Sequence, residues 1–142
     1  MITIIEGGKE SGKTTVLEEM IRDEQGRGKT IIRGLDKQTI ESILDRKYGK
    51  CLIVLDEQYN WFSSRRSMSN NNRLVAYVAS MSDGLCADIV ISVRDRRQVD
   101  RRVREKASLF LICLGKPNKD GVVLVVPEII DRHRLGKERA KI

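Results

Sequence analysis

The chain has 142 residues, of which 40% are hydrophobic and 33% charged, and its formal net charge is +7. This length suits a single domain with one core, and no apolar run is long enough to span a bilayer, so we expect a cytoplasmic globular protein without a membrane segment. The basic excess favours a polyanionic partner, although a solvated basic surface would give the same composition.

The first predicted element is an apolar strand over residues 2–6, which leads into a helix that ends near Gly26. Residues 7–14 between them read G-x-x-x-x-G-K-[ST], the pattern of a phosphate-binding loop. In such a loop, backbone N–H groups turn toward a phosphate, Lys13 reaches the β and γ phosphates, and the Thr14 hydroxyl binds Mg²⁺. The expected nucleotide-binding residues are Gly7, Gly8, Lys9, Glu10, Ser11, Gly12, Lys13, Thr14 and Thr15.

A second strand over 29–33 and a helix over 36–48 precede the most apolar strand, residues 51–55, which runs directly into Asp56 and Glu57. An acidic residue at the carboxyl end of a strand can hold magnesium through its waters, so Asp56 is the candidate metal-binding residue. Glu57 is suited to take a proton from the water that attacks the γ-phosphate.

The segment after Glu57 is polar, and residues 63–72 predict a loop. Its Arg65 and Arg66 either contact DNA phosphates or belong to an ordinary surface loop. An aromatic group just before the loop either stacks on nucleotide bases or packs the loop against the body. The members of this group are Tyr59, Trp61 and Phe62.

The remaining predicted elements are a helix over 72–81, a buried strand over 88–93, a basic helix over 96–106 and a strand over 108–113. A turn at 118–121 and a strand over 122–126 predict a C-terminal hairpin that ends at Pro127. We therefore expect one nucleotide-binding domain over 1–127 and a basic tail over 128–142. Alternating strands and helices predict an α/β three-layer sandwich with a mainly parallel sheet.

The three cysteines and the single histidine do not form a metal site in the sequence pattern. Cys51, Cys86 and Cys113 lack metal-ligand spacing, and we expect them to be small buried hydrophobic residues in a reducing compartment. His133 lies in the basic tail, which disfavours a histidine-based catalytic triad.

Four segments together resemble the FtsK/HerA class of DNA-pumping ATPases, above all the viral genome-packaging and zonula-occludens-toxin-like ATPases. The segments are Gly7 to Thr14 (Walker A), Leu52 to Glu57 (Walker B), Cys86 to Val93, and Val99 to Arg104. The resemblance covers nearly the whole chain, and its specificity comes from the two nucleotide motifs. It implies a RecA-like core in which strand 88–93 is inserted between the Walker A and Walker B strands.

The resemblance also implies a ring, commonly a hexamer, in which an arginine from a neighbouring subunit completes each ATP site. Arg104 matches that arginine, with Arg101 and Arg102 as substitutes, although the same cluster could be a solvated or DNA-facing basic helix. The family places a polar residue at the end of the inserted strand to sense the γ-phosphate. This chain has Arg94 there, and a guanidinium can also contact phosphate.

The sequence thus predicts an ATPase with Glu57, Lys13, Arg104 and Arg94 as catalytic residues and with ATP and Mg²⁺ bound. Double-stranded DNA is the expected partner, the host cytoplasm the expected location if the protein is viral, and genome packaging the expected role. Two alternatives remain open at this stage. One is a nucleotide kinase with residues 63–72 as its lid, and the other is a non-catalytic nucleotide-binding assembly subunit.

Overall fold

The computed structural model describes residues 1–8, 10–45, 49–56, 87–99, 101–115 and 124–129. Its elements, in chain order, are β1 (Ile2–Glu6), α1 (Lys13–Gly26), β2 (Thr30–Arg33), α2 (Lys37–Leu44), β3 (Cys51–Asp56), β4 (Ala87–Val93), the 3₁₀ helix η2 (Arg96–Gln98), α4 (Arg101–Lys106), β5 (Leu109–Leu114) and β6 (Leu124–Ile129). The expected loop over 63–72, the helix over 72–81, the aromatic group before them and residues 130–142 of the tail lie outside the described residues, while residues 128 and 129 belong to β6.

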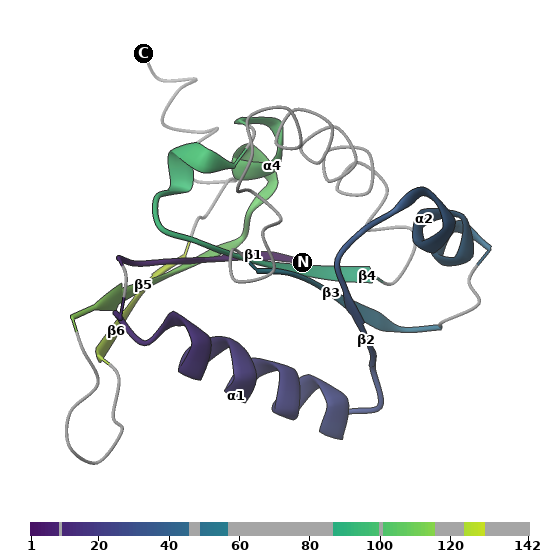
Figure 1. The fold of residues 1–142 in the computed structure, drawn as a ribbon, viewed down its shortest axis with the longest axis horizontal. Coiled ribbons are helices and arrows are strands. Elements are labelled where there is room, and N and C mark those ends of the chain that lie inside the picture. The colour runs from purple at the N-terminus through teal and green to yellow at the C-terminus, as the bar shows by residue number, and fades with distance from the viewer. Residues whose placement is uncertain (9, 46–48, 57–86, 100, 116–123, 130–142) are drawn as a thin grey trace, which may run out of the picture.

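The strands form one six-stranded sheet in the order β2-β3-β4-β1-β5-β6. All neighbouring pairs are parallel except β5 and β6, which are antiparallel. Helix α1 covers one face of the sheet, and α2 and α4 lie on the other, which gives three layers (Figure 1). The expectation of an α/β fold with a mostly parallel sheet and an antiparallel C-terminal pair is confirmed.

Strand β4 pairs with β1 on one side and with β3 on the other. Ile89 of β4 is in register with Ile2 of β1 and with Ile53 of β3. The central position of β4 explains its apolar sequence, because a strand with neighbours on both edges and helices on both faces is fully enclosed. The equivalence of β4 to the inserted strand of the FtsK/HerA class stays a prediction.

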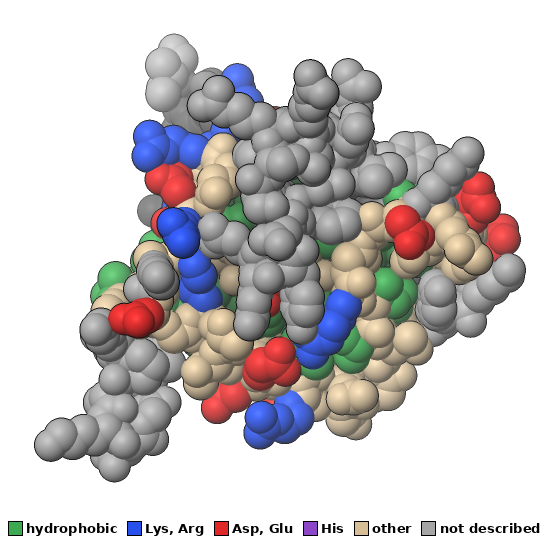
Figure 2. Space-filling view, in the orientation of Figure 1, with side chains coloured by type: hydrophobic (Ala, Val, Ile, Leu, Met, Phe, Trp, Pro, Cys, Tyr) green, Lys and Arg blue, Asp and Glu red, His purple; other side chains and the backbone are tan. Residues whose placement is uncertain are grey.

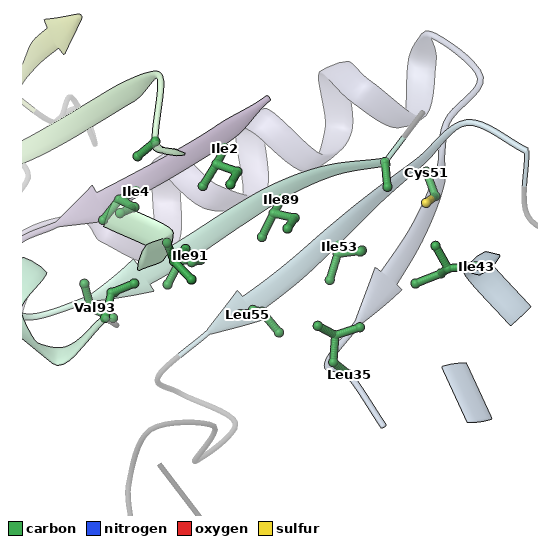
Figure 3. Close-up of a cluster of buried hydrophobic side chains, with 14 of the residues drawn as sticks. Ile2, Ile4, Leu35, Ile43, Cys51, Ile53, Leu55, Ile89, Ile91 and Val93 are labelled. Atoms are coloured by element: carbon green, nitrogen blue, oxygen red, sulfur yellow. The ribbon is translucent and has the colours of Figure 1, made fainter. Parts of the chain in front are cut away.

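The core consists of two clusters of buried side chains, one on each face of the sheet. The cluster between the sheet and the layer of α2 and α4 includes Ile4, Ile53, Leu55 and Ile91, each at most 1% exposed (Figure 3). The cluster under α1 is smaller and joins Leu17 and Ile21 of the helix to side chains of β1, β3, β4 and β5. Each fully buried side chain of this size contributes about 1.5–3 kcal/mol, so these faces hold the layers together.

The basic segment after β4 is not the single helix that the sequence predicts. It forms η2 and then α4, and the chain is extended at Val99 between them, with φ −92° and ψ 138°. The side chains of Val99 and Val103 are at most 2% exposed, and the extended residue lets both reach the core. Burial of these two valines therefore outweighs continuity of the helix.

The expectation that Pro127 ends the last strand is wrong, because β6 continues through it to Ile129. Pro127 is in register with Leu111 of β5. Proline lacks an N–H, but β6 is the edge strand of the sheet, where one row of backbone groups needs no ladder partner.

Two of the three cysteines are described, and both are buried free thiols, as expected: Cys51 and Cys113. Burial raises the pKa of the Cys113 thiol, against a smaller opposing effect of nearby Lys13. The thiol is therefore neutral at physiological pH and acts as a packing group. Among the described residues, no helix has the length and apolar character to cross a membrane.

Candidate nucleotide-binding site

The loop between β1 and α1 has the backbone of a tight anion-binding turn. Glu10 has φ 61° and Gly12 has φ 92°, both in the left-handed region, and the N–H of Ser11 donates to the Gly8 carbonyl at 3.2 Å. Helix α1 begins at Lys13, and its N-cap residue, Gly12, has no side chain to cap the first turn. Its first-turn N–H groups, together with the positive end of the helix, are donors suited to a phosphate.

Gly7 is packed so tightly that no other residue fits without a shift. A Cβ atom there would lie 2.3 Å from Ser11 Oγ and 3.1 Å from the Cys113 carbonyl oxygen. The N–H of Gly7 also donates to the Val93 carbonyl at 3.2 Å, which anchors the start of the loop to β4. The first glycine of the motif is thus required by close packing, whereas a Cβ on Gly8 would meet no atom of the described residues within 4 Å.

The side chain of Lys13 folds back over the loop, and its Nζ donates to the Gly7 carbonyl at 2.6 Å. This position places the ammonium over the turn that the loop glycines form. Ser11, also in the loop, is 4% exposed, and its buried hydroxyl has no hydrogen-bond partner among the described residues. An ammonium and a buried hydroxyl in one loop fit a bound phosphate group.

Asp56 lies at the carboxyl end of β3, on the side of the sheet that α1 covers. Leu52 and Val54 belong to the core cluster under α1, and side chains alternate along a strand, so Asp56 faces the same way. Its register partner on β4 is Ser92, which in turn pairs with Ile5 one residue before the end of β1. Asp56 and the start of α1 therefore share one end and one face of the sheet.

These two positions have donor chemistry that fits magnesium. Mg²⁺ usually keeps several waters and binds one or two carboxylates together with substrate phosphates. One carboxylate (Asp56, 6% exposed) and one hydroxyl at the start of α1 (Thr14) match that pattern. The described residues contain no cluster of three or more His, Cys, Asp or Glu side chains that could hold a metal by themselves.

The chain leaves β4 through a rigid corner that carries Arg94. The N–H groups of Arg94 and Asp95 both donate to Gln98 Oε1, at 3.0 and 3.1 Å. Asp95 caps η2 in return, and hydrogen bonds from Arg97 lower the pKa of its carboxyl to about 2. The backbone of Arg94 is thereby fixed at the same end of the sheet as the loop, and its side chain is exposed.

Much of the positive charge after β4 is paired within the chain. Arg96 contacts Glu6 and Glu128, Arg97 contacts Asp95, and Arg101 contacts Glu105. In the view of Figure 2, the described Lys and Arg side chains lie beside Asp and Glu side chains rather than in one continuous basic surface. The number of basic residues in this segment therefore overestimates its electrostatic attraction for a polyanion.

Arg104 is half-buried on α4, and in the part of the chain that the structure describes its buried Nε has no hydrogen-bond partner. A buried guanidinium nitrogen without an acceptor is uncommon, because such a group costs roughly 1–3 kcal/mol. Whether Arg104 completes a neighbouring site stays a prediction, as does the role of Arg101. Glu57 and Lys9 lie outside the described residues, and so does the side chain of Arg102.

The arrangement of these elements matches solved structures of viral packaging proteins. The DNA-packaging ATPase B204 from Sulfolobus Turreted Icosahedral Virus superposes with a TM-score of 0.56 at 14% identity, over 78% of this chain and 74% of that one. The genome-packaging NTPase B204 from Sulfolobus turreted icosahedral virus 2, in complex with ATP-gammaS, gives 0.56 at 15% identity over the same shares. This chain has their fold.

A third match is B204 from virus 2 in complex with AMP, with a TM-score of 0.54 at 13% identity, over 84% of this chain and 77% of that one. No protein-family model matches the sequence, and no curated protein matches it significantly. The comparison therefore supports the expected likeness to viral packaging NTPases at the level of fold.

One feature of the site could not be foreseen from the motifs. Glu6, the last residue of β1, contacts Arg96, which lies 90 positions away. The only sequence signal was a charged residue at the end of an otherwise apolar strand, and that is common in strands that lead into loops.

Proposed function

We propose that this protein is an ATP-hydrolysing motor that moves double-stranded DNA, in the manner of a viral genome-packaging ATPase of the FtsK/HerA class. The observation that carries the proposal is the joint position of the phosphate-binding loop and Asp56 on one end and one face of the sheet. It is supported by the fold shared with B204, whose solved structures include complexes with ATP-gammaS and AMP.

In the proposed reaction, the loop backbone and Lys13 hold the β and γ phosphates, and Thr14 and Asp56 hold the magnesium ion. The ion, when bound, would neutralise charge on the β and γ phosphate oxygens. Glu57 accepts a proton from a water whose oxygen attacks the γ phosphorus. The bond to the bridging oxygen breaks, and ADP leaves with the bond's electron pair, so that the products are ADP and inorganic phosphate.

Two arginines complete the proposed machinery. Arg94, on the fixed corner after β4, contacts the γ-phosphate, and Arg104 from a neighbouring subunit stabilises charge in the transition state. An arginine supplied in this way is worth roughly 10³–10⁵ in kcat in other phosphoryl-transfer enzymes. Since this role acts only across a subunit boundary, the proposal includes a ring, with a hexamer expected.

A steady-state assay of phosphate release from ATP, with and without duplex DNA, tests the proposal. We expect DNA to stimulate release and Glu57→Gln to abolish it. Glu41→Gln is the matched control, because Glu41 is an exposed residue of α2 and the chemical change is the same. Phosphate that appears on a small acceptor instead of water would favour a nucleotide kinase, and tight ATP binding without turnover would favour an assembly subunit.

A further inference from the structure

A charged pair joins the end of the phosphate-loop strand to the corner after β4. Glu6 Oε2 accepts a hydrogen bond from the backbone N–H of Arg96 at 2.6 Å and another from Arg96 Nε at 3.1 Å. Glu6 directly precedes Gly7, the first residue of the loop motif. The side chains of Glu6 and Arg96 are 19% and 30% exposed, so water screens this pair only partly.

The guanidinium of Arg96 is held from two further sides. Its Nη2 donates to Glu128 Oε2 on β6 at 3.2 Å, and its Cζ lies 4.3 Å from the centroid of the Phe110 ring on β5. A cation over an aromatic face at this distance is attracted to the ring. Arg96 is therefore fixed in place by Glu6, Glu128 and Phe110, which belong to three different strands.

These contacts determine where Arg94 lies relative to the loop. Gln98 holds the backbone N–H groups of Arg94 and Asp95, so the residues from Arg94 to Gln98 form one rigid corner. Arg96 is the residue of this corner that binds Glu6, while the Gly7 N–H to Val93 carbonyl bond anchors the corner's other end. Two attachments, one at each end of Arg94, tie it to the start of the loop.

We propose that Arg96 is a positioning residue for ATP hydrolysis: through Glu6 it fixes the backbone of Arg94 against the phosphate-binding loop. The inference rests on the proposed function, because it gives Arg94 a task at the γ-phosphate. Arg96 itself does not touch the nucleotide, since its guanidinium is engaged by Glu6, Glu128 and Phe110. Its loss should affect the rate of hydrolysis more than ATP affinity, because the loop backbone and Lys13 still grip the phosphates.

The test measures kcat, KM and the dissociation constant of a fluorescent ATP analogue for wild type, Arg96→Gln and Arg96→Lys. We expect Arg96→Gln to lower kcat about tenfold or more, because a misplaced catalytic group can cost as much as about 100-fold, and to change KM and analogue affinity less than about threefold. Arg96→Lys keeps the charge and one donor toward Glu6, so its kcat should lie between those of wild type and Arg96→Gln. A purely structural role would not produce this separation of kcat from KM.

Arg97→Gln is the matched control, because it removes the same charge from the same 3₁₀ helix, and its guanidinium contacts Asp95 rather than Glu6. It should keep wild-type kcat in the absence of DNA. Glu6→Gln combined with Arg96→Gln should cost less than the sum of the two single changes, since both disrupt the ion pair between the Glu6 carboxylate and the Arg96 guanidinium, while the backbone N–H of residue 96 is present in every variant. Thermal melting of each variant establishes that it is folded.

The outcomes separate the two proposals. If wild type releases no phosphate from ATP, both the proposed function and this inference fail. If wild type hydrolyses ATP and folded Arg96→Gln has the same kcat, or loses kcat and affinity together, only the positioning role fails. Should Arg96→Gln not fold, Arg96→Lys decides: a reduced kcat at wild-type KM supports the inference, and a wild-type kcat overturns it.

Discussion

Replacement of Gly7 by alanine tests the packing of the phosphate-binding loop. The new Cβ would lie 2.3 Å from Ser11 Oγ and 3.0 Å from Cys113 Cβ. Ordinary van der Waals contact begins at 3.4 Å, so the first distance is too short by more than 1 Å. The Ser11 hydroxyl can rotate away, but the Cys113 carbonyl at 3.1 Å belongs to the backbone of β5 and cannot move without disturbing the strand. The loop must therefore shift.

Overpacking of this kind costs typically 1–3 kcal/mol. For domains of about 150 residues, each kcal/mol lowers the melting temperature by roughly 2–4 °C, so Gly7→Ala should melt about 2–12 °C below wild type. The affinity for ATP should fall with it, because the displaced loop no longer aims its N–H groups correctly. Thermal melting without nucleotide and calorimetric titration with ATP measure the two effects.

Gly8→Ala provides the matched control, since a Cβ on Gly8 meets no other atom within 4 Å among the residues that the structure describes. Its melting temperature should stay close to that of wild type. Ser11→Ala in the Gly7→Ala background should restore part of the loss, because it removes the closest contact and leaves those with Cys113. Equal melting of Gly7→Ala and wild type, or equal damage from both alanines, would refute the packing argument.

Three further predictions follow from the structure. In Asp88→Asn we expect the free energy of unfolding to fall by roughly 1 kcal/mol at neutral pH. Burial opposes ionisation of the Asp88 carboxyl, but hydrogen bonds from Lys29 and the Met1 amine outweigh it and lower the pKa. A carboxyl whose pKa is lower in the folded state stabilises the fold at pH values above its unfolded pKa of about 3.9. In urea titrations, the difference in unfolding free energy between wild type and Asp88→Asn should therefore shrink as the pH falls below about 4, and a difference independent of pH would contradict this. In Arg104→Ala we expect hydrolysis to fall about a hundredfold or more with ATP affinity nearly intact, whereas Lys106→Ala, an exposed change on the same helix, should have no effect. Mixing Arg104→Ala with Glu57→Gln should restore some hydrolysis if the arginine acts between subunits, and wild-type activity of Arg104→Ala alone would exclude the assignment. In Asp56→Asn we expect the magnesium concentration that gives half-maximal hydrolysis to rise about tenfold, and an unchanged magnesium titration would remove Asp56 from the site.

The sequence alone was sufficient for the elements whose signals are local. The loop motif of residues 7–14 was recognisable because its spacing is itself the requirement for cradling phosphate, and the strand over 51–55 because enclosed strands are continuously apolar. The helix after the loop was predicted from its apolar period and the glycines that follow it, and α1 confirms it.

Local signals failed where burial or position in the sheet decided the conformation. The segment 96–106 has helical composition throughout, yet Val99 is extended because it and Val103 must both reach the core. Pro127 is a strand terminator by local chemistry, but β6 is an edge strand, and there the missing N–H costs nothing.

Only the tertiary structure decided which side chains meet at the candidate site. Asp56 and the start of α1 share a face because of strand register, and Glu6 contacts Arg96 because β4 pairs directly with β1. Contacts between residues 90 positions apart depend on the order of the strands, which no local pattern encodes. The sequence supplied the candidate nucleotide-binding groups, and the pairing of strands determined which of them lie together at one end of the sheet.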